Sequence, residues 1–386
     1  MGWEIGYGKQ NEEKGTYHSV EDYGCEFSHV RIFQVEGGYH FGPLNPTAVW
    51  AEFISLVPTR FRRFCCEAKE FRATQQLPLK TVGDIGMSNL ELFVSQSNVF
   101  SGIQRNFEDA DYVVFGVPFD VTSTYRTGAR FGPNAIRQAS LNIETFSLRS
   151  GFDVEDLRLH DAGDLHVSTD TKKTVDMVRL VIEDVLAAGK KPVVMGGEHT
   201  VTLGIAKGLD AKASKTAIVS FDAHLDLRCE FLGLNLSHTT FMQLISEEVK
   251  PAKIIEVGTR SVCKDELAYA KKAGIDFLTS RQIIREGSEQ IVKTLKEKLA
   301  PYENVYLTMD MDVLDPAFAP AVQNPEPEGI TTTALLDIVC ALCDKRVVGF
   351  DVLEIAPMFD QGVSAIVAAK VMFEMLCQLE KKRKSR

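Results

Sequence analysis

Carboxylate and imidazole side chains gather at four places in the chain, each just after a short apolar run. Two of these clusters alternate, as Asp222-x-His224-x-Asp226 and Asp310-x-Asp312. Because successive side chains of an extended backbone point to opposite faces, the alternation predicts that the named groups converge. Converging carboxylates and imidazoles are suited to binding divalent cations. The candidate metal ligands are His199, Asp222, His224, Asp226, Asp310 and Asp312.

The charge of this ligand set indicates how many ions it holds. One Asp after a strand often caps the next helix, and one His is often a core residue, but capping does not explain polar clusters at four strand ends. Four carboxylates packed against apolar strands would repel one another by several kcal/mol at low effective dielectric. Two divalent ions balance them. The set contains no thiolate, which favours two Mn(II) per subunit over zinc or iron–sulfur chemistry, with nickel, cobalt and iron as alternatives.

The elements that must position these residues follow one another as short β-branched runs and longer amphipathic stretches from residue 111 onward. This order is typical of βα units, and near-continuously apolar strands are typical of a sheet covered by helices on both faces. We therefore predict an α/β fold, a three-layer αβα arrangement with a mainly parallel sheet. The expected strands are residues 112–117, 192–195, 216–221, 253–257, 275–278, 305–309 and 347–353. The expected helices are residues 171–188, 281–299, 331–343 and 361–379.

Because ligands of such sheets bind outside the carboxyl ends of the strands, the polar clusters should meet at one edge.

Residues 1–86 lack a sustained period of 2 or 3.6 and are interpreted as an N-terminal extension, possibly disordered. Residues 87–386 then form the catalytic domain.

Composition excludes several classes of function. The formal net charge of -10 argues against binding to nucleic acid, which needs clustered Lys and Arg. No apolar run is long enough to span a bilayer, and the N-terminus lacks a signal-peptide pattern, so we expect a cytoplasmic protein without membrane partners. The 8 cysteines show no disulfide spacing, and Cys340 and Cys343 lie on a predicted apolar helix face.

Five motifs stand in the chain in the following order: GGEH (196–199), SFDAHLDLR (220–228), SHTTF (237–241), MDMDVLDPAFAP (309–320) and DVLEIAP (351–357). Over roughly residues 105–380 they resemble the ureohydrolase family, the arginases and agmatinases. Residues 116–120, 127–133 and 324–329 are similar to agmatinases, archaeal ones especially. The resemblance implies the arginase-like fold, a small cationic guanidino substrate and a homo-oligomer, a trimer or hexamer.

The resemblance also implies a role for each candidate residue. Asp222 and Asp310 would bridge two metals, with His199 and Asp226 completing one site and His224 and Asp312 the other. The metals would lower the pKa of a water molecule that attacks the guanidinium carbon, and Asp226 would take its remaining proton.

Two further residues match catalytic positions of the family. His238 would pass a proton to the leaving amine, unless it is a surface histidine at a helix start. Glu354 would pair with the guanidinium, unless it is a surface charge at a strand end. Glu198, next to His199, has no role from chemistry and is expected only to surround the site.

Agmatine, cleaved to putrescine and urea, is the substrate that the resemblance favours. Cys229 and Thr239 depart from what many agmatinase-like sequences carry beside the pocket. Arginine, guanidinobutyrate and formiminoglutamate therefore stay open as substrates. A single-zinc deacetylase of the same fold would not need both His199 and the Asp310 and Asp312 pair. A catalytically silent metal-binding scaffold is the alternative of another class, against which His238 and Glu354 argue.

Overall fold

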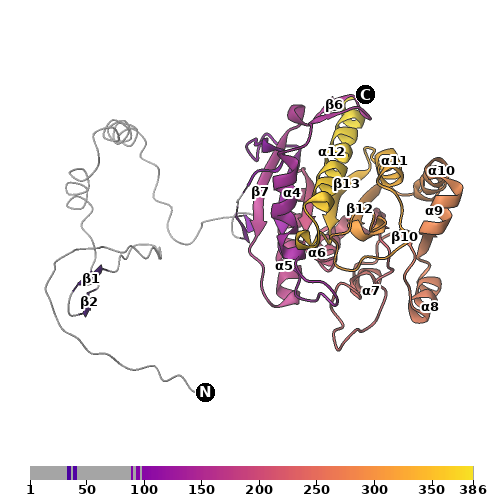
Figure 1. The fold of residues 1–386 in the computed structure, drawn as a ribbon, viewed down its shortest axis with the longest axis horizontal. Helices are drawn as coiled ribbons and strands as arrows, with labels where there is room; N and C mark the ends of the chain where they lie inside the picture. Colours follow the sequence, from indigo (N-terminus) through magenta and orange to yellow (C-terminus); the bar gives the residue numbers. More distant parts are fainter. Residues whose placement is uncertain (1–32, 36–37, 41–87, 90–92, 96–97, 386) are drawn as a thin grey trace, which may run out of the picture. The chain divides into compact units, whose positions relative to one another are not determined.

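The computed structural model describes residues 33–35, 38–40, 88–89, 93–95 and 98–385 (Figure 1). The chain divides into two units, Met1–Ile85 and Gly86–Arg386. In the first unit, β1 (Phe33–Val35) pairs antiparallel with β2 (Gly38–His40). The rest of the predicted extension, residues 1–86, lies outside the described residues, so its separation from a catalytic domain stays a prediction.

The second unit is built on one sheet, and among the described residues this sheet has nine strands, eight of them parallel. Across the sheet they are β11 (Asp276–Thr279), β10 (Lys253–Thr259), β9 (Thr216–Phe221), β12 (Asn304–Asp310), β13 (Val347–Leu353), β8 (Lys191–Gly196), β4 (Tyr112–Val117), β7 (Leu159–Leu165) and β3 (Val94–Ser95). Only β3 in this set runs antiparallel. A small hairpin of β5 (Phe146–Ser147) and β6 (Phe152–Asp153) lies apart from the sheet. The predicted α/β fold with a mainly parallel sheet is confirmed.

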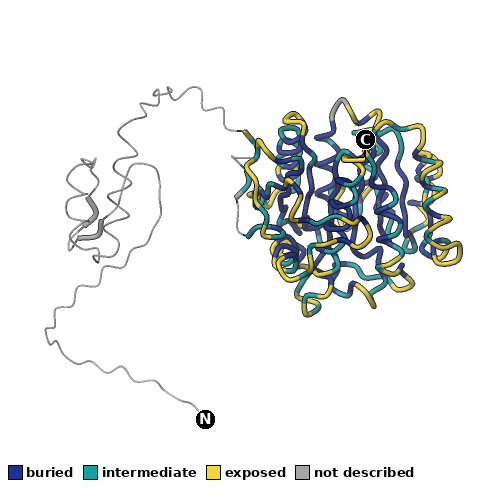
Figure 2. Tube along the Cα trace, turned by 90° about the horizontal axis from the view of Figure 1, so that it is seen from above, coloured by how far each residue is buried: buried dark blue, intermediate teal, exposed yellow. Residues whose placement is uncertain are grey.

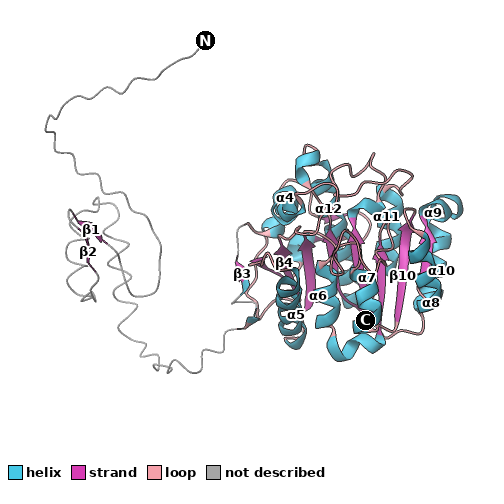
Figure 3. Ribbon diagram, turned by 90° about the horizontal axis from the view of Figure 1, so that it is seen from below, coloured by secondary structure: helices cyan, strands magenta, loops and turns pink. Residues whose placement is uncertain are grey.

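Helices cover both faces of the sheet, so the fold has three layers (Figure 3). One layer consists of α4 (Gly132–Ser140), α9 (Ser280–Glu286), α10 (Ser288–Leu299), α11 (Thr332–Leu342) and α12 (Val363–Lys384). The other consists of α5 (Thr171–Ala187), α6 (Val201–Gly208), α7 (Phe241–Leu244) and α8 (Lys264–Ala273). Alternate residues of one strand enter different cores, as Val219 and Ile218 of β9 do. Burying each such side chain stabilises the fold by roughly 1.5–3 kcal/mol. Figure 2 shows the buried residues gathered at the centre of this unit.

The helices begin where capping residues stand. Asp170 accepts a hydrogen bond from the Lys173 amide at the start of α5, and Thr331 accepts one from the Ala334 amide at the start of α11.

The prediction of one helix over residues 281–299 is wrong, because the segment forms α9 and α10. Gly287 separates them with a φ of 81°, which an L side chain adopts only with strain. The apolar spacing continues across this break and therefore does not reveal it.

The cysteine and membrane predictions can be compared with the described residues. Cys340 lies in α11 and Cys343 follows it, and both are buried and unpaired, in agreement with an apolar helix face. In the described part of the chain, no helix combines the length and apolarity that crossing a membrane requires.

Candidate metal centre

The four polar clusters lie at the same edge of the sheet. The strands that precede them, β9, β12, β13 and β8, are consecutive neighbours, and their carboxyl ends point the same way. Asp222 follows β9 directly, Asp310 ends β12, and His199 lies between β8 and α6. The parallel topology thus places the predicted ligands around one point.

The glycine pair before His199 allows this loop to approach its neighbours closely. A Cβ at Gly197 would lie 1.8 Å from the Phe119 carbonyl oxygen, so any side chain there would displace the backbone. The Gly197 amide donates to the Val117 carbonyl, and its own carbonyl accepts from the Glu354 amide, both at 2.8 Å. Glycine at this position therefore joins the ends of β4, β8 and β13 and fixes His199 between them.

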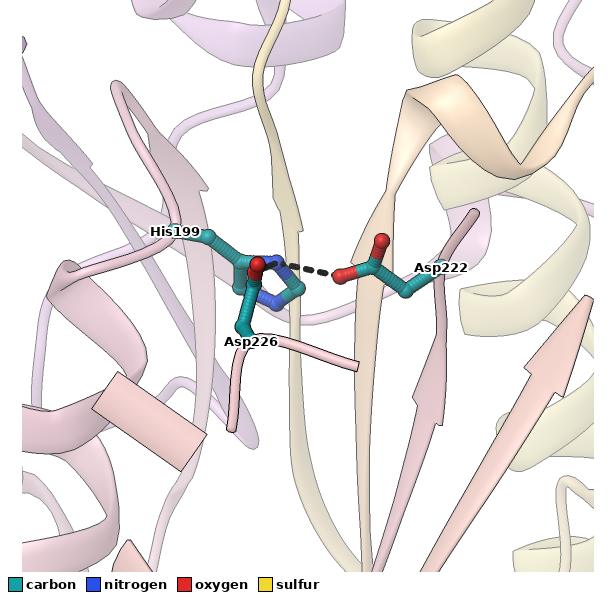
Figure 4. Close-up of side chains that lie close together, drawn as sticks. All are labelled: His199, Asp222 and Asp226. Carbon is teal, nitrogen blue, oxygen red and sulfur yellow. Dashed lines mark ion pairs between the residues drawn. The ribbon is translucent and has the colours of Figure 1, made fainter. Parts of the chain in front are cut away.

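Two groups of ligand atoms form at this edge, and within each group the atoms lie within 4.8 Å of one another. In the first, His199 Nδ1 lies 3.0 Å from Asp222 Oδ2 and 3.9 Å from Asp226 Oδ2 (Figure 4). In the second, His224 Nδ1 lies 3.0 Å from Asp312 Oδ2 and 3.5 Å from Asp222 Oδ1. Asp222 belongs to both groups and offers one oxygen to each, which is the geometry of a ligand shared by two ions.

Asp310 lies beside the first group but belongs to neither. Its Oδ2 is 3.5 Å from His199 Nδ1, while its Oδ1 accepts a hydrogen bond from the Asp312 amide at 2.7 Å. Residues Met311–Val313 form a 3-10 turn, so the backbone here is not extended. The period-of-two argument for Asp310 and Asp312 is therefore wrong in its geometry, although both carboxylates lie at the predicted edge. A bridging role for Asp310 stays a prediction.

The donor set fits divalent cations. His199 Nδ1 is buried and, within the described part of the protein, makes no hydrogen bond even though Asp222 Oδ2 is 3.0 Å away. Burial raises the pKa of the Asp226 and Asp310 carboxyl groups well above the ordinary range, and neighbouring carboxylates add to this effect. Bound cations would satisfy the free nitrogen and remove the repulsion between the carboxylates.

A buried hydroxyl–carboxylate pair holds the His199 ring. Its Nε2 lies 2.9 Å from Thr308 Oγ1, and Thr308 donates its proton to Asp351 Oδ1 at 2.6 Å. Since the Thr308 proton is engaged, Thr308 must accept from Nε2–H, which leaves the Nδ1 lone pair for the ligand groups. Asp351 is fully buried and also accepts from the hydroxyl groups of Tyr306 and Thr202.

A cavity of about 260 Å³ opens over the two groups. Asp226, Asp310, His238 and Glu354 line it, together with residues that the sequence interpretation did not assign, among them Thr124, Asn324 and Glu326. This volume suits a small molecule.

His238 is buried at the cavity wall, so it is not a surface histidine. Its Nδ1 lies 3.3 Å from Thr122 Oγ1, and its Nε2 lies 3.2 Å from Thr124 Oγ1 and 3.4 Å from Asn324 Nδ2. Burial lowers the pKa of His238 to about 4, with nearby His224 adding to the shift. The ring is therefore neutral at pH 7 and presents Nε2 towards the cavity.

Glu354 is also buried, which excludes a surface charge. Its Oε1 accepts a hydrogen bond from the His199 amide at 2.5 Å, and among the described residues its Oε2 has no hydrogen-bond partner. Glu354 and Asp226 both adopt a positive φ, 69° and 50°, which costs about 1–3 kcal/mol at each residue. The surrounding contacts hold two carboxylates in a conformation that side chains otherwise avoid.

The sequence did not predict the side chains that hold His199 and His238. These are Thr308 with its partner Asp351 for His199, and Thr122 for His238. Asp351 had a local signal, because a carboxylate inside the apolar run of β13 must find buried donors. Thr122 had none, since it stands 116 positions from His238.

The family model described as the Arginase family matches residues 110–377. An agmatinase of Bacillus anthracis is 36% identical over 284 residues, which cover 72% of this chain and 95% of that protein. An N(1)-aminopropylagmatine ureohydrolase of Thermococcus kodakarensis is 36% identical over 271 residues, covering 69% and 90%. The crystal structure of an agmatine ureohydrolase of Thermoplasma volcanium superposes with a TM-score of 0.70 at 31% identity, covering 77% of this chain and 99% of that one.

Proposed function

Because the chain belongs to the arginase family, we propose that it is a ureohydrolase that uses two divalent metal ions to cleave agmatine into putrescine and urea. The observation that carries this proposal is the position of Asp222. One carboxylate is shared by two ligand groups, and His224 and Asp226 of these groups line a cavity together with His238 and Glu354. This arrangement supports a pair of metals facing a small substrate.

The proposed ligands divide between the two ions. His199, Asp222 and Asp226 would hold one, and Asp222, His224 and Asp312 the other, with Asp310 adjoining the first. When bound, the two ions, proposed to be Mn(II), lower the pKa of water and supply hydroxide near neutral pH. Oxygen and imidazole donors suit manganese, with nickel, cobalt or iron as alternatives.

The protein side chains orient the substrate and move protons. Glu354 lines the cavity, with one oxygen fixed by the His199 amide and the other without a partner among the described residues, so this second oxygen would accept N–H groups of the guanidinium. Asp226, one of the proposed ligands of the first ion, would take a proton from the attacking water. His238 delivers a proton through Nε2 to the leaving nitrogen.

The charge of the cavity supports a substrate whose far end is neutral or cationic. Besides the candidate ligands, Glu266, Glu326 and Glu354 line it, while Arg228 is the only lysine or arginine in its described lining. Arginine and guanidinobutyrate carry a carboxylate that this wall disfavours. Of the two residues that depart from many agmatinase-like sequences, Thr239 lines the cavity and Cys229 is exposed. Arginine and guanidinobutyrate therefore stay open as substrates.

Urea release by the manganese-loaded protein tests the proposal, with agmatine, arginine, guanidinobutyrate and guanidine assayed in parallel. We expect agmatine to give the highest kcat/KM. A preference for guanidinobutyrate or arginine would show that the substrate assignment is wrong. No urea from any of the four would favour a catalytically silent scaffold instead.

Replacing Thr308 with Val is expected to weaken binding of one of the two ions. The substitution keeps the size of the side chain but removes the hydroxyl that accepts from His199 Nε2. Loss of such a partner typically lowers metal affinity about 10- to 100-fold. Titration calorimetry with Mn(II) should show one site weakened and the other unchanged, while Thr308→Ser, which retains the hydroxyl, should bind both ions normally. Equal affinities in Thr308→Val and the unmodified protein would exclude this role.

Two proposals concern the protein as a whole. The resemblance to ureohydrolases supports a homo-oligomer, a trimer or hexamer, and light scattering on the purified full chain measures this directly. The acidic composition and the cysteines of the described residues, which form no disulfide, support a cytoplasmic location.

A further inference from the structure

Glu198, the acidic residue of the GGEH motif, lies at the start of a hydrogen-bond chain that ends at His238. Its carboxylate is fully buried. Oε2 accepts from the Thr122 amide at 2.8 Å, and Oε1 accepts from the hydroxyl groups of Thr122 and Thr200 at 2.5 and 2.7 Å. Three donors thus satisfy one buried carboxylate, and two of them come from Thr122.

The hydroxyl of Thr122 connects this carboxylate to the histidine. A hydroxyl has one proton to donate, and Thr122 donates it to Glu198. Towards His238 the same oxygen can only accept. It lies 3.0 Å from the His238 amide and 3.3 Å from His238 Nδ1. Nδ1 must therefore carry a hydrogen atom.

The opposite end of the ring leads to the same assignment. Nε2 lies 3.4 Å from Asn324 Nδ2, an amide nitrogen that can only donate. The Thr124 hydroxyl, 3.2 Å from Nε2, can donate as well. Nε2 is then an acceptor whose lone pair faces the cavity, where His238, Thr124 and Asn324 all contribute to the wall.

We propose that Glu198 and Thr122 are positioning residues that hold His238 in the tautomer with hydrogen on Nδ1 and the Nε2 lone pair towards the substrate. This inference rests on the proposed function and assigns a task to the GGEH glutamate within it. In hydrolysis a C–O bond forms, the C–N bond breaks, and both protons of the water end on the leaving nitrogen, which departs as an ammonium group. Nε2 accepts one of these protons and releases it to that nitrogen, so the ring returns to its starting state.

The substitution Glu198→Gln should reverse the tautomer. The new side chain must still accept from the Thr122 amide, which places its carbonyl oxygen at the position of Oε2 and its NH2 group at that of Oε1. The NH2 group then donates to the Thr122 hydroxyl, whose proton turns to His238 Nδ1. Nδ1 becomes an acceptor, and Nε2 carries the hydrogen that blocks it from receiving a proton.

Nitrogen NMR of the full chain, labelled with 15N at histidine and loaded with diamagnetic zinc, measures the tautomer directly. The ring signals of His238 are identified by their absence in His238→Asn. We expect hydrogen on Nδ1 in the unmodified protein and in Thr122→Ser, hydrogen on Nε2 in Glu198→Gln, and a mixture in Thr122→Val. Thr200→Val serves as the matched control, because it removes a donor from Glu198 but keeps the contact between Thr122 and His238. Hydrogen on Nε2 in the unmodified protein, or no change in Glu198→Gln, would overturn the proposal.

Kinetics separates this positioning role from a purely structural one. In Glu198→Gln, kcat for urea release should fall by about 10²- to 10⁴-fold, the contribution of acid–base catalysis, while KM and metal content stay unchanged. Thr122→Ser should restore the turnover that Thr122→Val loses. Parallel losses in kcat and metal content would contradict the assignment. If the unmodified protein releases no urea from any guanidino compound, the proposed function fails, whereas the NMR result still decides the tautomer.

Discussion

The substitution Asp222→Asn is expected to remove most of the bound metal and nearly all turnover. Asp222 is buried and lies in both ligand groups, with its two oxygens 3.0 Å from His199 Nδ1 and 3.5 Å from His224 Nδ1. An amide keeps the shape but removes the negative charge that both ions share. Elemental analysis of the purified, manganese-loaded variant, together with its urea release, measures the two effects.

The matched control for this prediction is Asp276→Asn. Asp276 lies on β11, an edge strand of the sheet, and pairs with Lys298 and Lys253. Losing a partly exposed ion pair of this kind costs only about 0–1 kcal/mol, so the variant should fold and keep both ions. Two ions per subunit in Asp222→Asn would contradict the shared ligand and, with it, the proposed two-metal site.

The substitution His238→Asn is expected to slow turnover by about 10²- to 10⁴-fold, the range that general acid–base catalysis contributes, without changing the metal content. The ring touches Thr122, Thr124 and Asn324 and belongs to neither metal-ligand group. Asparagine can still donate to the Thr122 hydroxyl, but its side chain cannot carry a proton to the leaving nitrogen. Steady-state kinetics on agmatine and metal analysis of the same sample test both halves of the prediction.

His160→Asn provides the comparison for His238→Asn. His160 lies on β7, where its Nδ1 contacts the Arg105 carbonyl at 2.8 Å and its ring packs edge-on against Phe107. This histidine is remote from the cavity lining, so its loss should leave kcat unchanged. A kcat in His238→Asn equal to that of His160→Asn would exclude proton transfer by His238.

Local patterns predicted most of the sheet because its strands are apolar on both faces. Residues 112–117, 216–221 and 347–353 were predicted as strands and form β4, β9 and β13 with the same bounds. β7 was missed, since it alternates buried and partly buried positions and carries two aspartates. One of them, Asp161, is buried with its charge balanced by Arg137 of α4, and the Phe100 amide also donates to it. An ion pair between a helix and a strand does not change the hydrophobic period of either segment, so the sequence pattern does not reveal it.

The candidate site followed from the sequence to the extent that its residues come directly after apolar runs. Parallel strands then bring them to one edge, whatever the conformation of the loops. The loops themselves were not predictable from alternation: β9 ends at Phe221, and Asp226 adopts a φ of 50°. The hydrogen-bond partners Thr122 and Thr308 depend on which strand ends are neighbours, and that is a property of the whole sheet order.

The left-handed backbone at Asp226 and Glu354 matters for any effort to engineer this protein. Glycine adopts such a φ without strain, so glycine at either position would relieve this backbone strain of about 1–3 kcal/mol. A library screened only for resistance to heat would therefore favour glycine at Asp226, whereas at Glu354 the loss of the hydrogen bond to the His199 amide, worth about 1–3 kcal/mol, offsets the gain. Engineering for higher thermal stability should leave both positions unchanged, since the residue that relieves backbone strain differs from the residue that activity requires.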